Sequence, residues 1–131
     1  MRQSVGRWFA LGALVVLAAP WNMAQAACPT RIVAGEVANG TQYLPEGGDC
    51  TVESGGLLES RNHAIYGTDG HTVIIDGEIE MEDGYSAGVD LDDDNTIILR
   101  GRISGSGEYS EGFFVKNRNR IENHGTIDLN G

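Results

Sequence analysis

The dominant feature of this sequence is a 24-residue repeat. From residue 62 the chain divides into three segments, 62–85, 86–109 and 110–131, with similar side chains at equivalent places. Apolar and polar residues alternate over short stretches, turn-forming residues separate these stretches, and no stretch has helical spacing. A strand–turn unit of this size cannot bury its own apolar side, so it must stack on copies of itself. The repeat therefore predicts an all-β fold, a parallel β-helix (β-solenoid) of about three 24-residue coils.

Two columns of equivalent residues define the register of the predicted stack. One column is glycine and the other is isoleucine, and each member lies one repeat after the member before it: Gly77, Gly101 and Gly125; Ile79, Ile103 and Ile127. Neighbouring strands in a sheet lie about 4.8 Å apart, so equivalent residues of successive coils should be neighbours. We expect both columns to form structural ladders along the stack.

The same register predicts contacts between opposite charges. Four pairs of residues one repeat apart combine an acid with a base: Asp92 with Lys116, Asp94 with Arg118, Asp76 with Arg100, and Glu78 with Arg102. Opposite charges on neighbouring strands stabilise a sheet, so stacked ion pairs are expected here. The alternative is that such pairs arise by chance in an acidic chain.

Residues 1–26 have the features of a signal peptide. Arg2 and Arg7 accompany an uncharged apolar run over residues 8–19, and residues 24–26 (Ala-Gln-Ala) fit the small-x-small cleavage pattern. The apolar run is shorter than the roughly 20 residues that span a membrane. We therefore expect export to the periplasm, cell surface or extracellular space, with no transmembrane segment in the mature chain. A membrane anchor and a lipoprotein processed at Cys28 are the alternatives.

The next segment, residues 27–61, lacks most of the repeat columns. It contains both cysteines of the chain, Cys28 and Cys50. An even number of cysteines in an oxidising compartment predicts one disulfide. We expect residues 27–61 to form an N-terminal cap with an incomplete first coil, closed by this disulfide, and residues 62–131 to form the solenoid repeats.

The chain is strongly acidic, and this limits its partners. Nineteen acidic residues against nine basic ones give a formal net charge of -10, and cleavage after residue 26 would change it to -10 - 2 = -12. This charge disfavours nucleic acid and anionic membranes.

The densest acidic run is a candidate metal site. Asp90, Asp92 and Asp94 alternate like the first three ligands of a calcium loop, but Asn95 and Gly101 replace its glycine and its bidentate glutamate. We expect a solvated turn and no cofactor, with calcium binding as the alternative.

The repeat resembles that of bacterial autotransporter passenger domains. The similarity is carried by N-R-I-E-N-H-G-T-I over residues 119–127, with looser copies over 95–107 and 71–79, and it covers residues 52–131. It implies a right-handed parallel β-helix from the N-terminal part of a passenger. Such proteins also carry a C-terminal outer-membrane barrel, which nothing in this chain resembles. The resemblance therefore implies a truncated passenger, a fragment or a free secreted relative.

A surface or adhesive role is the function that we expect. His63, His71 and His124 occupy different columns, no Ser–His–Asp set can be placed, and we expect no catalytic residue. The alternatives are a small polysaccharide-acting β-helix enzyme, which would need paired carboxylates in a groove, and a calcium-stabilised binding module.

The expected partner is an unknown surface ligand or glycan. Exposed aromatic side chains could anchor it, and the candidates are Tyr66, Tyr85, Tyr109 and Phe114, whereas Phe113 is expected in the core. We also expect that the last coil exposes unpaired backbone groups and allows self-association.

Overall fold

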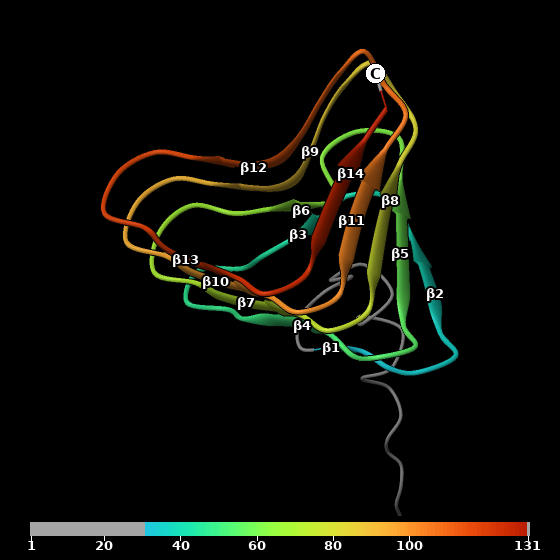
Figure 1. Cartoon of the computed structure of the whole chain (residues 1–131). Helices are drawn as coiled ribbons and strands as arrows, with labels where there is room; N and C mark the ends of the chain where they lie inside the picture. Colours follow the sequence, from blue (N-terminus) through green and yellow to red (C-terminus); the bar gives the residue numbers. More distant parts are fainter. Residues whose placement is uncertain (1–30, 131) are drawn as a thin grey trace, which may run out of the picture.

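The computed structural model describes residues 31–130, and the expected signal peptide and Cys28 lie outside this range. Within residues 31–130, fourteen strands form three parallel sheets, to which successive coils contribute one strand each (Figure 1). The first sheet contains β1 (Arg31–Ile32), β4 (Cys50–Val52), β7 (Thr72–Ile75), β10 (Thr96–Leu99) and β13 (Arg120–Asn123). The second contains β2 (Val37–Asn39), β5 (Leu57–Ser60), β8 (Glu78–Met81), β11 (Arg102–Gly105) and β14 (Thr126–Leu129). The third contains β3 (Gln42–Tyr43), β6 (Ile65–Tyr66), β9 (Tyr85–Leu91) and β12 (Tyr109–Val115).

The molecule is a β-solenoid of about four turns rather than about three. From β7 onward the register is the predicted one, since Ile97 pairs with Val73 and with Ile121. Earlier coils are shorter: Cys50 pairs with Val73 at a spacing of 23, and Arg31 pairs with Thr51 at a spacing of 20. Residues 31–61, expected as a cap with an incomplete coil, therefore contribute strands to the same three sheets as the repeats.

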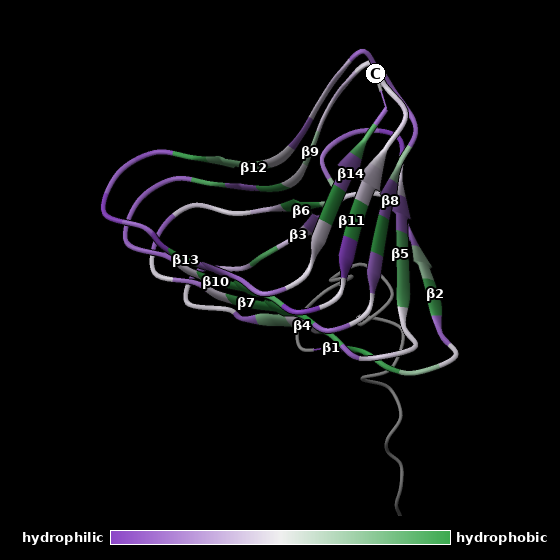
Figure 2. Ribbon diagram, in the orientation of Figure 1, coloured by the Kyte–Doolittle hydropathy of each residue, from purple (hydrophilic) through white to green (hydrophobic). Residues whose placement is uncertain are grey.

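The core lies between the three sheets. In strands such as β7 and β10 alternate side chains are buried, and Figure 2 shows that hydrophobic residues are concentrated on the strands. The isoleucine ladder runs through the core: Ile79 and Ile103 are fully buried, and Ile127 packs against the core partly buried. The predicted ladder is therefore present, with Leu58 preceding it in the same column.

The glycine ladder lies at the corner between the first and second sheets. A Cβ atom on Gly101 would stand 2.0 Å from the carbonyl oxygen of Gly77, and one on Gly125 would stand 2.2 Å from that of Gly101. Backbone of successive coils therefore approaches too closely here for any side chain. The sequence column reflects this steric limit.

The corner between the third and first sheets requires a left-handed backbone. Gly70, Asp94 and Arg118 are equivalent residues with φ of 76°, 60° and 55°. Beside these residues, a ladder of polar side chains pairs the backbone N–H groups of the turn. The side-chain oxygen of Asn95 accepts a hydrogen bond from the His71 N–H at 2.7 Å, and the side-chain oxygen of Asn119 accepts one from the Asn95 N–H at 2.8 Å. Buried amides of this kind must be paired, so these side chains serve the turn.

Two further sequence predictions concern the N-terminal part and the membrane. Cys50 is fully buried on β4, but Cys28 lies outside the described residues, so the disulfide stays a prediction. Within residues 31–130, no helix has the length and apolar character to cross a membrane.

Candidate functional site

Three of the four predicted ion pairs form between successive coils. Lys116 Nζ lies 2.8 Å from Asp92 Oδ1. Arg100 binds Asp76 with two hydrogen bonds of 2.7 and 3.2 Å, and Arg118 binds Asp94 with two of 2.8 and 2.7 Å. The hydrogen bonds to Arg118 lower the pKa of Asp94 below its ordinary value.

The fourth predicted pair was wrong in its partner. Arg102 is the register neighbour of Glu78, as expected, but its guanidinium lies 2.8 Å from Asp128 Oδ2 on β14. Asp128 lies two positions beyond Thr126, which pairs with Arg102, so both acids lie on the outward face within reach of the long side chain. Register alone could not decide between them.

The aspartates of the candidate calcium site are not brought together. Asp92 binds Lys116, Asp94 binds Arg118, and Asp90 lies beside His63 instead. In the described part of the chain, no three or more His, Cys, Asp or Glu side chains are placed to hold a metal ion. The run is an outward turn whose charges face different neighbours.

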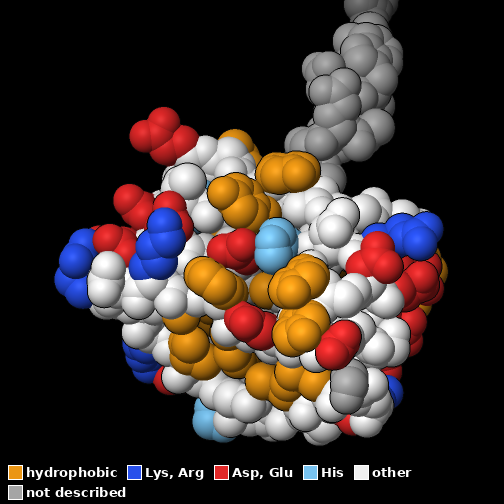
Figure 3. Space-filling view, turned by 90° about the horizontal axis from the view of Figure 1, so that it is seen from above, with side chains coloured by type: hydrophobic (Ala, Val, Ile, Leu, Met, Phe, Trp, Pro, Cys, Tyr) orange, Lys and Arg blue, Asp and Glu red, His pale blue; other side chains and the backbone are white. Residues whose placement is uncertain are grey.

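The third sheet carries an unusual outward surface. Five exposed aromatic side chains project from β3, β6, β9 and β12, and we call this surface the aromatic face: Tyr43, Tyr66, Tyr85, Tyr109 and Phe114. Phe113 points the other way and packs on the core, as predicted. In the space-filling view from above, hydrophobic side chains gather around a histidine and acidic side chains (Figure 3). Ligand-binding surfaces are often exposed apolar patches of this kind, so the aromatic face is the candidate functional site.

One column of the aromatic face crosses all four strands. Strand register places Tyr43, Tyr66, Asp90 and Phe114 side by side in that order. The rings of Tyr43 and Tyr66 meet edge to face with centroids 5.7 Å apart. Asp90 is therefore a single carboxylate in a ladder of aromatic rings.

A second aromatic pair lies where β9 and β12 begin. Tyr85 and Tyr109 stack with ring centroids 4.6 Å apart and planes inclined by 12°, and Tyr85 is 74% exposed. These rings line a hollow of about 120 Å³ together with His63, Glu111 and Phe114. The hollow offers flat apolar walls with an imidazole and a carboxylate at its border.

His63 and Asp90 form the polar centre of this face. The N–H of Ala87 donates a hydrogen bond to His63 Nδ1 at 3.2 Å, so in the neutral imidazole the proton is on Nε2. Nε2 faces Asp90 Oδ2 at 3.5 Å. Burial raises the pKa of Asp90, and the nearby Asp92 adds to this effect, whereas His63 and Lys116 oppose it.

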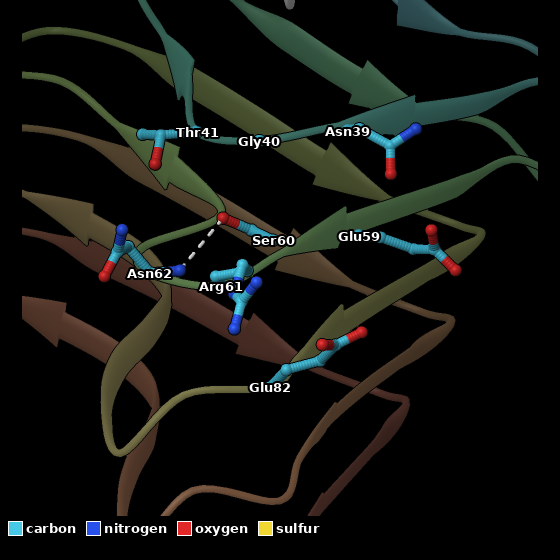
Figure 4. A pocket seen from close by; sticks show the side chains of 8 residues that line it. All are labelled: Asn39, Gly40, Thr41, Glu59, Ser60, Arg61, Asn62 and Glu82. Atoms are coloured by element: carbon cyan, nitrogen blue, oxygen red, sulfur yellow. Dashed lines mark hydrogen bonds between the residues drawn. The ribbon is translucent and has the colours of Figure 1, made fainter.

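A second hollow, of about 420 Å³, has a polar lining (Figure 4). It is lined by the end of β2, the end of β5 with the following turn, and Glu82 after β8. Ser60 is already engaged, because its hydroxyl donates to the carbonyl of His63 and accepts from the N–H of Asn62. Asn62 and Glu82 also line this hollow, and Arg61 is held loosely by an ion pair of 3.6 Å with Asp83, so these three groups could bind a polar ligand.

A third hollow of similar size lies along the glycine corner and is lined by Asp76, Glu78 and Arg102. Asp76 and Arg102 already take part in ion pairs between coils, so this hollow has few free polar groups to offer.

Comparisons of the chain with models of protein families, with curated proteins and with solved structures gave no match.

Sequence reasoning predicted part of this site and missed part. It identified Tyr66, Tyr85, Tyr109 and Phe114 as possible anchors, and all four are exposed on one face. It missed Tyr43, because the coil that carries it is out of the 24-residue register. The contact between His63 and Asp90 was missed because the two residues are not equivalent in the repeat, so register alone does not pair them.

Proposed function

We propose that this chain is a glycan-binding β-solenoid with a surface or adhesive role. The observation that carries the proposal is the aromatic face, where four parallel strands carry five exposed rings and two of these rings, Tyr66 and Phe114, flank Asp90. Flat aromatic rings bury the apolar C–H faces of sugar rings, and polar groups between them bind hydroxyls. Exposed rings on rigid strands are also pre-organised, so little ordering entropy opposes binding.

The geometry favours an extended polymer over a small compact ligand. The column of Tyr43, Tyr66, Asp90 and Phe114 advances by one strand per residue, or about 4.8 Å. A sugar chain lying along the stack would meet one side chain on each coil, with Tyr85 and Tyr109 forming a parallel track. The polar hollow offers further hydrogen-bonding groups to a ligand that extends beyond the rings.

The wider setting of this function is also part of the proposal. The signal-peptide features of residues 1–26 support export to the periplasm, cell surface or extracellular space. The repeat motif of residues 119–127, carried on a parallel β-solenoid, supports a passenger-like protein of the autotransporter type. A surface solenoid that binds glycans would act as an adhesin.

The test compares glycan binding by the wild type and by ring-deleted variants. Replacing Tyr66 and Tyr85 by alanine should weaken binding to a glycan array by at least about tenfold, because stacked rings dominate such interfaces. Val37→Ala on β2 is the control, since Val37 is 53% exposed and lies on another sheet. Unchanged binding by the ring-deleted variant, or no binding by the wild type to any glycan class, would contradict the proposal.

A second candidate function, cleavage of a bound polysaccharide, is favoured by two carboxyl groups of the aromatic face. Asp90 has a raised pKa, as a general acid requires, and Glu111 supplies another carboxylate on the same face. The release of new reducing ends by the wild type but not by Asp90→Asn would establish this function. Binding without release would leave the adhesive role.

A further inference from the structure

We infer that Asp90 and its aromatic neighbours form a subsite for an ammonium group, so that the ligand of this face is a glycan carrying free amino groups. This inference rests on the proposed glycan-binding function and names its ligand class. It is carried by the partners of Asp90, by the rings beside it and by the charge of the surrounding surface.

The Asp90 carboxylate lacks a close cation. Among the described residues its ionic partner is His63, and the 3.5 Å separation exceeds the roughly 2.7–3.2 Å of an N–H···O hydrogen bond. Lys116 is committed elsewhere, because its Nζ binds Asp92 at 2.8 Å. Yet the Asp90 side chain is only 18% exposed, so water solvates it incompletely. A bound cation would supply the missing partner.

The two strand neighbours of Asp90 suit a cation rather than another hydrogen-bond donor. Register places Tyr66 on one side of Asp90 and Phe114 on the other, and these rings are 41% and 48% exposed. A cation within about 6 Å of a ring centroid is attracted by the electrons of the ring face. An ammonium bound to Asp90 would lie within reach of both rings, so carboxylate and rings would act on the same charge.

The negative charge of the molecule also favours glycans that carry positive charge. The chain has a net charge of -10, and Glu111 adds a carboxylate to the aromatic face. Uronic acid or sialic acid groups would be repelled by Asp90 and Glu111, whereas protonated amino sugars would be attracted. Neutral sugars could stack on the rings but would leave Asp90 without a counter-charge.

The test uses three soluble oligosaccharides of equal length: glucosamine, N-acetylglucosamine and galacturonate. The wild type should bind the glucosamine oligomer about tenfold more tightly than the N-acetylglucosamine oligomer in calorimetry at about pH 6, and should not bind the galacturonate oligomer. Asp90→Asn should abolish the preference, so that the glucosamine and N-acetylglucosamine oligomers bind with equal affinity. The control Asp76→Asn removes the same charge at another corner, where Asp76 pairs with Arg100, and should keep the preference.

The results test the ammonium subsite and the glycan-binding face separately. Equal affinity of the wild type for the glucosamine and N-acetylglucosamine oligomers would overturn the ammonium subsite and leave the glycan-binding face intact. Equal loss of preference in Asp90→Asn and Asp76→Asn would also overturn it, because general charge attraction would then be the cause. Absence of binding to all three oligomers would overturn the ammonium subsite as well, and the glycan array would then test the proposed function separately. Circular dichroism of both variants establishes that the fold is retained.

Discussion

At the scale of single residues, Asp90 and Asp94 show how position sets the effect of a carboxylate. Both belong to one acidic run, yet burial raises the pKa of Asp90 and Arg118 lowers that of Asp94. A raised native pKa means that Asp90 favours folding only when protonated, so its contribution is lost as pH rises from the ordinary value of 3.8 through the native pKa. Asp94 contributes stability above 3.8, and this is lost as pH falls through its lower native pKa.

These opposite signs give a prediction for thermal melts. At about pH 7 Asp90→Asn should raise Tm by a few degrees and Asp94→Asn should lower it. Both differences should shrink as the pH falls below 3.8, because Asp90 becomes protonated in the native protein and Asp94 becomes protonated in the unfolded chain. The groups that face Asp90, namely His63, Asp92 and Lys116, are unchanged in both variants. A lower Tm for Asp90→Asn at neutral pH would show that His63 outweighs burial.

At the scale of elements, the corner between the first two sheets is a tight part of the fold. A Cβ atom on Gly101 would lie 2.0 Å from the carbonyl oxygen of Gly77 and 2.6 Å from that of Asp76. Gly101→Ala must therefore displace backbone, and we expect a loss of about 1–3 kcal/mol of unfolding free energy, as for overpacked cores. Gly84→Ala is the control, because its Cβ would meet nothing within 4 Å. Chemical denaturation measures both, and equal midpoints would refute the steric explanation of this ladder.

The same corners show what a sequence repeat can and cannot reveal. The glycine column was visible because a steric limit admits one residue type at successive coils. The column of left-handed residues was not visible in the sequence, because three different residue types, Gly70, Asp94 and Arg118, adopt the same positive φ. Contacts between equivalent residues of successive coils could be predicted directly. The contact of Arg102 with Asp128 could not, because the reach of a long side chain decides it.

At the scale of the whole molecule, the solenoid was predictable and its number of coils was not. The 24-residue repeat revealed the later coils, whereas the spacings of 20 and 23 hid the earlier ones that β1–β6 form. The aromatic face depends on this difference, because its column begins with Tyr43 in the first coil and continues through Tyr66 in the second. A binding surface that runs along the stack can be recognised only when the strand register of every coil is known.

The core of the stack is less well covered at its last coil. Ile97 and Ile103 are fully buried beneath the next coil, but Ile121 on β13 is 40% exposed and Leu129 on β14 is 37% exposed. These strands are also the outermost of their sheets in the described structure, so they present unpaired backbone groups. We therefore expect a chain of residues 27–131 to self-associate through this side. Residues 27–131 carry a net charge of -10 - 2 = -12, which opposes association, so association should increase with salt.

Light scattering after size-exclusion chromatography measures this association at increasing protein and salt concentrations. The apparent mass should rise with both, and Ile121→Lys with Leu129→Lys should return the chain to a monomer, because lysines at a sheet edge block strand pairing. Val33→Lys with Val37→Lys tests the opposite side of the stack, where these residues are 42% and 53% exposed beside the outermost strands β1 and β2. A monomer in this variant too would indicate head-to-tail association, whereas unchanged association would indicate that two copies meet through their last coils. A wild type that stays monomeric at every concentration would show that the backbone edge and the two apolar side chains are too small a surface to drive pairing.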